Sequence, residues 1–342
     1  KKFSDYVKSK FSISFNSCTS ALHSAVAILN LNKNDYVWTT PNSFVASSNC
    51  VLFNGNKLDF VDIDSNTGSM SLYELKKKLS KTPKNKLPKA IINVHFAGVA
   101  NRQFEIWKLS KKYGFKIIED ACHALGGSYL GEKVGSCRWS DLCVFSFHAI
   151  KSITTGEGGM VTTNNTKFAK KLELIKSHGI SRNIRNINNK GNYLVYDQKL
   201  LGYNFRLTEF QAALGINQLK KLNYFIDVRK KIATYYFQKL KKQKLEFLTI
   251  DKNVKSSFHL LVIRVSKKIK KKLIEAFLKK KIFVSYHYIP IYKHSFYKKI
   301  GFKNYKLKSM EKYQQECVSL PIHTKLKFKE IDKIIKVIKT LT

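Results

Sequence analysis

Acidic residues are scarce in this sequence of 342 residues. Asp and Glu together number 23 against 63 Lys and Arg, which gives a formal net charge of +40. A surplus of this size can indicate a nucleic-acid or anionic-surface partner. The basic residues are spread along the whole chain, however, which favours compositional drift over a dedicated groove for polyanions. We expect no nucleic-acid partner, and a modest benefit for a phosphorylated substrate through electrostatic steering stays open.

Long apolar runs and paired cysteines are also missing. No run of about 18 apolar residues is present, so we expect no membrane span and no membrane partner, and no signal peptide is visible. The six cysteines form no CxxC pair and no metal-ligand spacing, and most lie in apolar runs, where free cysteine behaves as a small hydrophobe. These features favour a cytoplasmic protein without a metal site. The sequence begins with Lys-Lys rather than Met, so we expect an N-terminal piece to be missing.

Apolar strands that alternate with helices dominate residues 1–222. Strands are predicted at 12–15, 35–40, 57–63, 89–96, 115–120, from Val144 and at 158–164. Helices are predicted at 20–29, from about Phe44, after the capping box Ser71 to Glu74, at 104–114 and up to about His178. This alternation implies a mostly parallel sheet covered by helices on both faces. We predict an α/β fold whose large domain covers 1–222.

The character of the sequence changes at about residue 223. A long basic amphipathic helix is followed by a strand at 258–265, a helix at 267–281, a strand at 282–288, a helix near 309–317 and a terminal helix at 327–341. These elements predict a smaller α+β domain over 223–342. Just before it, residues 180–200 lack periodicity and are interpreted as a long loop. The capping box Thr208 to Gln211 then opens a helix within 201–222.

One lysine and one carboxylate stand at the ends of two predicted strands. Lys151 lies in a glycine-rich turn after the strand from Val144, and Asp120 ends the strand at 115–120. Pyridoxal phosphate (PLP) chemistry needs such a pair. The lysine binds the aldehyde of the cofactor, and the carboxylate keeps the pyridine nitrogen protonated so that the ring accepts electrons. The sequence therefore predicts PLP as the cofactor, with Lys151 and Asp120 as catalytic residues.

Other residues follow the same strand ends. Thr19, Phe44 and Ser146 all lie at or just after predicted strand ends, where parallel α/β sheets bind their ligands. The segment Asn16–Ser20 also begins a predicted helix, and small hydroxylated residues at a helix N-terminus can form an anion site. Taken alone, this segment is better explained as an ordinary N-cap.

Several segments together resemble the DegT/DnrJ family of PLP-dependent sugar aminotransferases. They are FNSCTSALH, TTPNSFVASSN, LDFVDID, IIEDACHALGG, VFSFHAIKSITTGEGG, SHGI, GYNFRLTEFQAALG and YHYIPIY, in the family's order from about residue 11 to residue 323. The resemblance implies the type I aminotransferase fold, with a mostly parallel mixed sheet between helices and a small C-terminal α+β domain. Within the family, the segments are most similar to those of the UDP-4-amino-4,6-dideoxy-N-acetylhexosamine transaminases of pseudaminic acid biosynthesis.

The resemblance implies roles around the cofactor ring for four residues. Lys151 would hold PLP covalently and move a proton between the donor carbon and the cofactor. Asp120 would pair with the pyridinium nitrogen, His123 would form a hydrogen bond with the phenolic oxygen, and Phe44 would stack on the ring.

Four further residues would contact the phosphate of the cofactor. Thr19, Ser20 and Ser146 would bind it with hydroxyl and backbone N–H groups. Asn204, with Arg206 as a weaker candidate, would reach the phosphate in the neighbouring subunit, which requires a homodimer. The family has a few tens of residues before the first strand, where this sequence has Lys1–Lys10. We expect that missing segment to contribute to the substrate pocket and the dimer.

The resemblance also implies a reaction. An amino group would pass from L-glutamate to a UDP-linked 4-keto-6-deoxy-N-acetylhexosamine, in bacterial surface-polysaccharide or pseudaminic-type acid biosynthesis. The loop at 180–200, the segment at 286–290 and His178 are expected near the sugar. The alternatives are a sugar 3-aminotransferase, a PLP-dependent or pyridoxamine phosphate (PMP)-dependent sugar dehydratase, and a non-catalytic sensor. The dehydratases have histidine in place of the lysine, so Lys151 argues against them.

Overall fold

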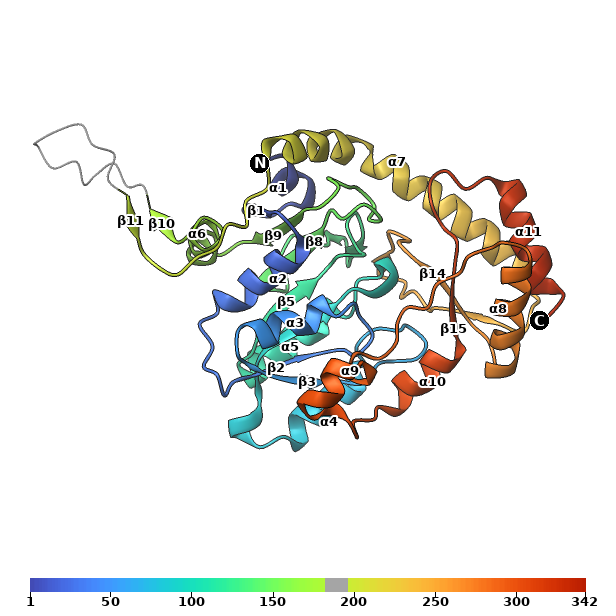
Figure 1. Cartoon of the computed structure of the whole chain (residues 1–342), viewed down its shortest axis with the longest axis horizontal. Coiled ribbons are helices and arrows are strands. Elements are labelled where there is room, and N and C mark those ends of the chain that lie inside the picture. Colours follow the sequence, from blue (N-terminus) through green and yellow to red (C-terminus); the bar gives the residue numbers. More distant parts are fainter. Residues whose placement is uncertain (182–195) are drawn as a thin grey trace, which may run out of the picture.

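Residues 1–181 and 196–342 are described by the structure, a computed structural model (Figure 1). Most of the loop predicted at 180–200 lies outside the described residues. At its two ends, β10 (Ile180–Ser181) pairs with β11 (Asp197–Gln198). Within the described part of the chain, no helix has the length and apolar character that crossing a membrane requires.

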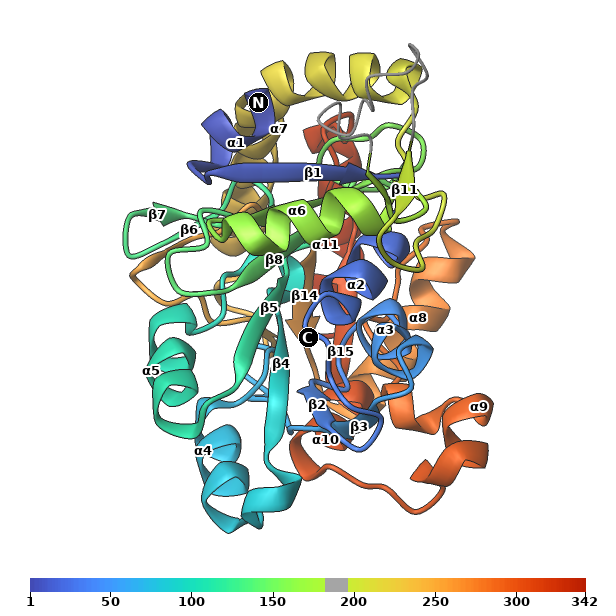
Figure 2. The ribbon, with the colours of Figure 1, turned by 90° about the vertical axis from the view of Figure 1, so that its left-hand side faces the viewer.

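A seven-stranded sheet forms the centre of the larger part of the molecule (Figure 2). Its strands lie in the order β1-β9-β8-β5-β4-β2-β3, and all neighbours are parallel except the two that pair with β9. Their bounds are β1 (Phe11–Phe15), β2 (Tyr36–Thr39), β3 (Lys57–Phe60), β4 (Pro88–Val94), β5 (Lys116–Asp120), β8 (Leu142–Ser146) and β9 (Gly159–Thr163). The predicted mostly parallel mixed sheet is therefore confirmed.

Helices cover both faces of this sheet. Successive strand residues point to opposite faces, so neighbouring residues of β4 pack in different cores. Ile92 lies in a core with Leu22 and Val51, whereas Ile91 lies in a second core with Leu75 and Ile106. The first core involves α2 (Cys18–Ala27), α3 (Ala46–Phe53) and α6 (Thr166–Ile175), and the second involves α4 (Leu72–Lys81) and α5 (Gln103–Tyr113). Figure 2 shows α2 and α3 on one side of the central strands and α4 and α5 on the other.

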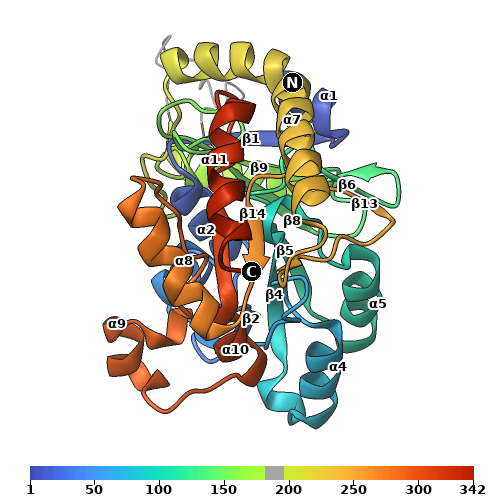
Figure 3. The ribbon, with the colours of Figure 1, turned by 90° about the vertical axis from the view of Figure 1, so that its right-hand side faces the viewer.

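The smaller part of the molecule contains an antiparallel sheet in the order β12-β14-β15. Its central strand β14 is labelled in Figure 3. The helices around it bury one shared core, which includes Tyr236, Ile263, Phe277 and Ile338. The elements are β12 (Glu246–Phe247), β14 (Leu261–Arg264), β15 (Cys317–Leu320), α8 (Lys267–Lys279), α10 (Lys308–Glu316) and α11 (Phe328–Lys339). This is the α+β arrangement that the sequence predicts.

One long helix, α7 (Glu209–Leu240), joins the two parts. The predicted capping box is present: Gln211 N donates to Thr208 Oγ1 (3.3 Å), and Thr208 N donates to Gln211 Oε1 (3.1 Å). Leu222 packs in the core of the larger part and Tyr236 in that of the smaller part. The helix is unbroken across 222 and 223, so the predicted domain boundary there stays a prediction.

The strand predicted at 282–288 is wrong. This segment forms one isolated bridge, between Ser285 and Ser319 of β15. Its end is bound to the larger part of the molecule instead, since Tyr288 N donates to Asn42 Oδ1 (2.9 Å) and Ile291 N donates to the carbonyl of Pro41 (3.1 Å). These bonds place residues 287 and 288 over the carboxyl ends of the central strands.

The remaining elements are short. They are α1 (Lys2–Val7), η1 (Lys84–Lys86), η2 (Phe96–Gly98), β6 (Ser128–Tyr129), β7 (Glu132–Lys133), β13 (Val254–Lys255), η4 (Ile291–Lys293), α9 (Ser295–Tyr297) and η5 (Lys298–Phe302).

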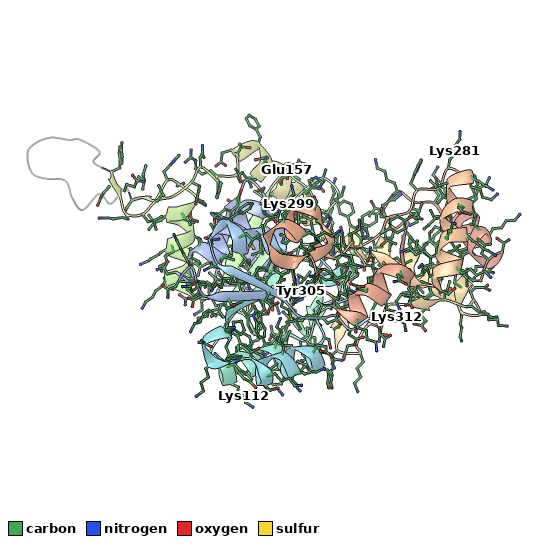
Figure 4. All side chains as sticks on the ribbon, turned by 60° about the horizontal axis from the view of Figure 1, so that its bottom comes forward. Lys112, Glu157, Lys281, Lys299, Tyr305 and Lys312 are labelled. Carbon is green, nitrogen blue, oxygen red and sulfur yellow. The ribbon has the colours of Figure 1, made fainter. Side chains whose placement is uncertain are left out.

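Lysines are distributed over many elements of the surface. Figure 4 labels Lys112 on α5, Lys281 after α8, Lys299 in η5 and Lys312 on α10, which lie on different parts of the molecule. The positive charge is therefore dispersed, as the sequence indicates.

Candidate active site

A cavity of about 400 Å³ lies at the carboxyl ends of the parallel strands. Val94, Asp120 and Ser146 are the last residues of β4, β5 and β8, and all three line it. His287 and Tyr288 contribute from the smaller part. Six of the eight predicted site residues lie in the cavity wall: Thr19, Phe44, Asp120, His123, Ser146 and Lys151. The sheet topology therefore brings these residues together at the carboxyl ends of the strands, where parallel α/β sheets bind their ligands.

The turn between β8 and β9 positions Lys151. Lys151 N donates to the carbonyl of His148 (2.9 Å), and Phe147 N donates to the carbonyl of Gly158 (2.8 Å), which closes the turn. A Cβ atom at Gly158 would lie 2.3 Å from Thr155 Oγ1, so a side chain here would have to displace the Thr155 hydroxyl. The turn holds the partly buried Lys151 in the cavity wall.

Asp120 is held as a buried hydrogen-bond acceptor. Ser47 Oγ donates to Asp120 Oδ2 (2.6 Å), and Cys122 N donates to Asp120 Oδ1 (3.2 Å). The Ser47 hydroxyl is also 2.6 Å from that of Ser43. Ser47 lies in the first turn of α3, whose N-terminal dipole favours negative charge. These contacts fix the orientation of the carboxyl group, which lines the cavity.

His123 lies among other histidines. Its ring stacks on that of His259, with centroids 4.3 Å apart, and its Nε2 is 3.3 Å from the Tyr288 hydroxyl. Burial, followed by the positive charge of Lys151, lowers the pKa of His123 well below its usual value. The imidazole is therefore neutral at pH 7. Its buried Nδ1 has no hydrogen-bond partner among the residues that the structure describes.

The start of α2 provides small polar groups at the cavity. Ser17 Oγ caps the helix by accepting a hydrogen bond from Ser20 N (3.1 Å), and Ser17 and Thr19 both line the cavity. The first turn of a helix has backbone N–H groups without intrahelical partners, which suit a phosphate. Ser20 lies behind the wall, where its hydroxyl donates to Asn16 Oδ1 (2.7 Å).

Asn204 does not line the cavity either. It forms an isolated bridge with Ser177, and its carbonyl accepts a hydrogen bond from Asn16 Nδ2 (3.5 Å). Its side chain is exposed. Arg206 and His178 line a separate, more open cavity. The predicted phosphate contacts of Ser20 and Asn204 stay predictions.

Sequence reasoning missed several residues of this site. Ser43 and Ser47 flank Phe44 in the segment NSFVASS, and that run of serines beside an aromatic residue was a usable signal. Nothing local indicated His259, because its stacking partner lies 136 positions away in the chain. Cys18 and Cys122 also line the cavity and were interpreted only as small hydrophobic residues.

Comparisons with known proteins agree with this geometry. The DegT/DnrJ/EryC1/StrS aminotransferase family matches residues 1–339. A UDP-4-amino-4,6-dideoxy-N-acetyl-beta-L-altrosamine transaminase of Campylobacter jejuni is 38% identical over 330 residues, which cover 95% of this chain and 84% of the relative. The structure of Helicobacter pylori PseC, an aminotransferase of pseudaminic acid biosynthesis, has a TM-score of 0.90 at 33% identity and covers 99% of this chain and 89% of its own.

The chain belongs to the DegT/DnrJ/EryC1/StrS aminotransferase family, and it is a PLP-dependent aminotransferase of fold type I. A further solved structure, a sugar aminotransferase of Streptococcus pneumoniae in its PMP form, has a TM-score of 0.89 at 27% identity over 99% of this chain and 90% of its own.

The residues of the cavity fit PLP. They offer an amine in Lys151, a hydrogen-bonded carboxylate in Asp120, an aromatic ring in Phe44 and hydroxyl groups beside a helix N-terminus. The unpartnered Nδ1 of His123 adds a polar group that a ligand could satisfy. Within the described residues, no group of three or more His, Cys, Asp or Glu side chains could hold a metal ion.

Proposed function

We propose that this protein transfers the amino group of L-glutamate to a UDP-linked 4-keto-6-deoxy-N-acetylhexosamine. The observation that carries the proposal is the presence of Lys151 and Asp120 in the wall of one cavity at the carboxyl ends of β5 and β8. The substrate class is supported by the UDP-sugar transaminases of Campylobacter and Helicobacter that the chain resembles. The product would enter bacterial surface-polysaccharide or pseudaminic-type acid biosynthesis.

In this proposal Lys151 has two tasks. Its Nζ holds the cofactor and, once the amino donor has displaced it, takes the proton from the donor carbon. The same Nζ returns a proton in the second half of the reaction, when the sugar receives the amine. PLP, when bound, supplies the electron sink for both halves.

Asp120 keeps the ring nitrogen of the cofactor protonated in this proposal. The hydroxyl of Ser47 and the N–H of Cys122 both donate to its carboxylate and hold it at the carboxyl end of β5. The cation of the ring would then face a buried anion, and that attraction is strong where water is excluded.

His123 and Phe44 orient the ring. A neutral His123 can form a hydrogen bond with the phenolic oxygen without adding a positive charge beside Lys151. Phe44 is 62% exposed although it lines the cavity, so its ring is free to stack on a flat ligand.

The phosphate would bind at the start of α2. Thr19, Ser20 and Ser146 are the proposed contacts, and Ser17 joins them because it lines the cavity beside Thr19. The helix dipole favours a dianion at this position. Ser20 N donates to Ser17 Oγ and the Ser20 hydroxyl donates to Asn16 Oδ1, so Ser20 would contribute only after one of these bonds is exchanged for the phosphate.

A homodimer completes the site in this proposal. Asn204 is exposed, and the nearby first turns of α7 expose Phe210 (91%) and Leu214 (44%), which share one helix face. Exposed apolar patches of this kind mark interaction surfaces. Asn204 would reach the cofactor phosphate of the neighbouring subunit. We also propose a cytoplasmic location, because all six cysteines are free and nucleotide sugars are intracellular metabolites.

The amino-transfer step can be tested by absorbance and mass spectrometry. The purified protein should absorb in the visible and lose that band when glutamate is added. Glutamate and a panel of UDP-linked and dTDP-linked keto sugars should then give an amino sugar with the UDP-4-keto-6-deoxy-N-acetylhexosamine. Lys151→Ala and Lys151→Arg should abolish both signals, whereas Lys299→Ala, at an exposed lysine in η5, should change neither. A product formed only from dTDP-sugars would refute the proposed substrate class.

A further inference from the structure

Two thiols face each other in the wall of the cofactor cavity. The Sγ atoms of Cys18 and Cys122 are 2.9 Å apart, although the residues are 104 positions apart in the chain. Cys18 is the first residue of α2, and Cys122 follows Asp120 by two positions. Both line the cavity and both are partly exposed. The proposed amino transfer uses neither thiol.

The other four cysteines differ from this pair. Cys50, Cys137, Cys143 and Cys317 are all buried. None of them lines the cavity. A reagent in solution therefore meets the Cys18–Cys122 pair first, and the pair already has the proximity that a disulfide needs.

We propose that Cys18 and Cys122 form a reversible dithiol–disulfide site inside the cofactor pocket, which reacts with small-molecule disulfides such as oxidised glutathione. Disulfides in proteins of reducing compartments are usually transient and redox-sensing. The site would thus link the redox state of the thiol pool to the loading of the aminotransferase with PLP.

The exchange proceeds in two balanced steps. The Cys18 thiolate attacks one sulfur of oxidised glutathione, which forms a mixed disulfide and releases one glutathione. The Cys122 thiolate then attacks the Cys18 sulfur, which forms the internal disulfide and releases the second glutathione. Two electrons pass from the protein thiols to glutathione, and the two thiol protons end on the released glutathione molecules.

The positions of the two thiols support this order. Cys18 is at a helix N-terminus, where negative charge is favoured. The hydrogen bond with Cys18, burial and the Asp120 carboxylate raise the pKa of the Cys122 thiol well above its usual value. Formation of the mixed disulfide on Cys18 removes that hydrogen bond, the largest of the three effects. Cys122 then ionises more readily and attacks the Cys18 sulfur of the mixed disulfide.

The disulfide and the cofactor should exclude each other. The bond would tie the start of α2, next to the proposed phosphate contact Thr19, to the segment after Asp120. PLP then shifts the thiol–disulfide equilibrium toward the thiols, and the disulfide weakens PLP binding by the same factor. At a PLP concentration about ten times its dissociation constant, disulfide formation should slow about tenfold.

The experiment incubates the full-length protein, with and without added PLP, with oxidised glutathione and follows its intact mass. The expected result is a loss of two hydrogen atoms, a tryptic cross-link between the peptides that contain Cys18 and Cys122, full reversal by dithiothreitol, and protection by PLP. Cys122→Ser should stop at one glutathione adduct on Cys18. Cys317→Ala, which removes a buried cysteine outside the cavity, should still form the internal bond.

Three results would overturn the proposal. They are a stable double adduct without an internal bond, a cross-link between other cysteines, and no reaction while a free thiol peptide in the same tube is oxidised. Mass readouts need no sugar substrate, so the outcome is independent of the proposed amino transfer. Circular dichroism of each variant checks that the chain is folded.

Discussion

At the scale of single residues, the account depends on the charge of Asp120. Its carboxylate accepts hydrogen bonds from Ser47 and from the backbone of Cys122, which hold it at the carboxyl end of β5. In Asp120→Asn an amide replaces the carboxylate, which keeps the shape of the side chain and removes its negative charge. The effect of that change on catalysis therefore reports the electrostatic role separately from packing.

Asp120→Asn should lower kcat about 10²- to 10³-fold, as the loss of a preorganised electrostatic group typically does. The variant should keep a folded circular dichroism spectrum. Asp227→Asn, on an exposed position of α7, serves as the matched control and should retain full activity. Steady-state rates with glutamate and the UDP-linked keto sugar provide the measurement. Activity within twofold of the wild type would contradict the assigned role.

Three neighbouring histidines should make the protein sensitive to acid. Burial and the charge of Lys151 lower the pKa values of His123 and His259, and lower that of His287 to about 4. In the unfolded chain each pKa is about 6.5. As the pH falls below about 6.5, the unfolded chain binds protons that the native protein does not, so the free energy of unfolding decreases.

Each such histidine contributes a slope of about 1.4 kcal/mol per pH unit at most. Urea unfolding between pH 8 and pH 5 should show the loss below pH 6.5. His259→Gln should make the curve shallower, because it removes one of the buried histidines whose pKa is lowered. A wild-type stability that is constant down to pH 5 would show that these histidines are not buried in neutral form.

Sequence could predict the residues whose signal is local. Lys151 and Asp120 stand out because each follows an apolar strand, and the glycine-rich turn marks the close approach at Gly158. Ser47 and His259 could not be found in this way. Their roles arise from contacts with Asp120 and His123, which the fold brings together across 73 and 136 positions.

At the scale of elements, the junction of β1, β9 and α2 positions the proposed phosphate site. Gly159 pairs with Phe15 of β1 and with Ser146 of β8. A Cβ atom at Gly159 would lie 2.4 Å from the carbonyl oxygen of Ser17 and 2.8 Å from Cys18 N. Both are backbone atoms, so a side chain here must displace the start of α2.

Gly159→Ala should therefore weaken PLP binding at least about tenfold, which corresponds to about 1.4 kcal/mol. Fluorescence titration of the apoprotein with PLP measures the effect. Gly156→Ala is the control, because open space surrounds that position and its positive φ adds only backbone strain of about 1–2 kcal/mol to the folding free energy. Unchanged PLP affinity in Gly159→Ala would argue against a phosphate site at this junction.

Elements with clear periodicity and capping were predicted well. The capping box at Thr208 and the strand at 115–120 both appear in the structure. The prediction of a strand at 282–288 was wrong because apolar and aromatic residues like these occur in connecting segments as well as in strands. Its backbone is bound by Asn42 and Pro41, which no local pattern reveals.

At the scale of the whole molecule, the dimer is the main prediction. Phe210→Asp places a charge on the exposed apolar face of α7 and should shift the protein from dimer to monomer in sedimentation velocity. Phe283 is 79% exposed in the smaller part, so Phe283→Asp is the matched control and should leave the dimer intact. If Phe210→Asp and Phe283→Asp showed the same proportion of dimer in sedimentation velocity, the dimer interface would lie elsewhere.

The central claim is that one amine, Lys151, holds the cofactor. Borohydride reduction of the purified protein, followed by tryptic peptide mapping, tests this claim most directly. It identifies which of the many lysine amines of the chain carries the cofactor. The account predicts a single phosphopyridoxyl group, on Lys151. A group on another lysine, or none on a protein that retains PLP, would contradict it.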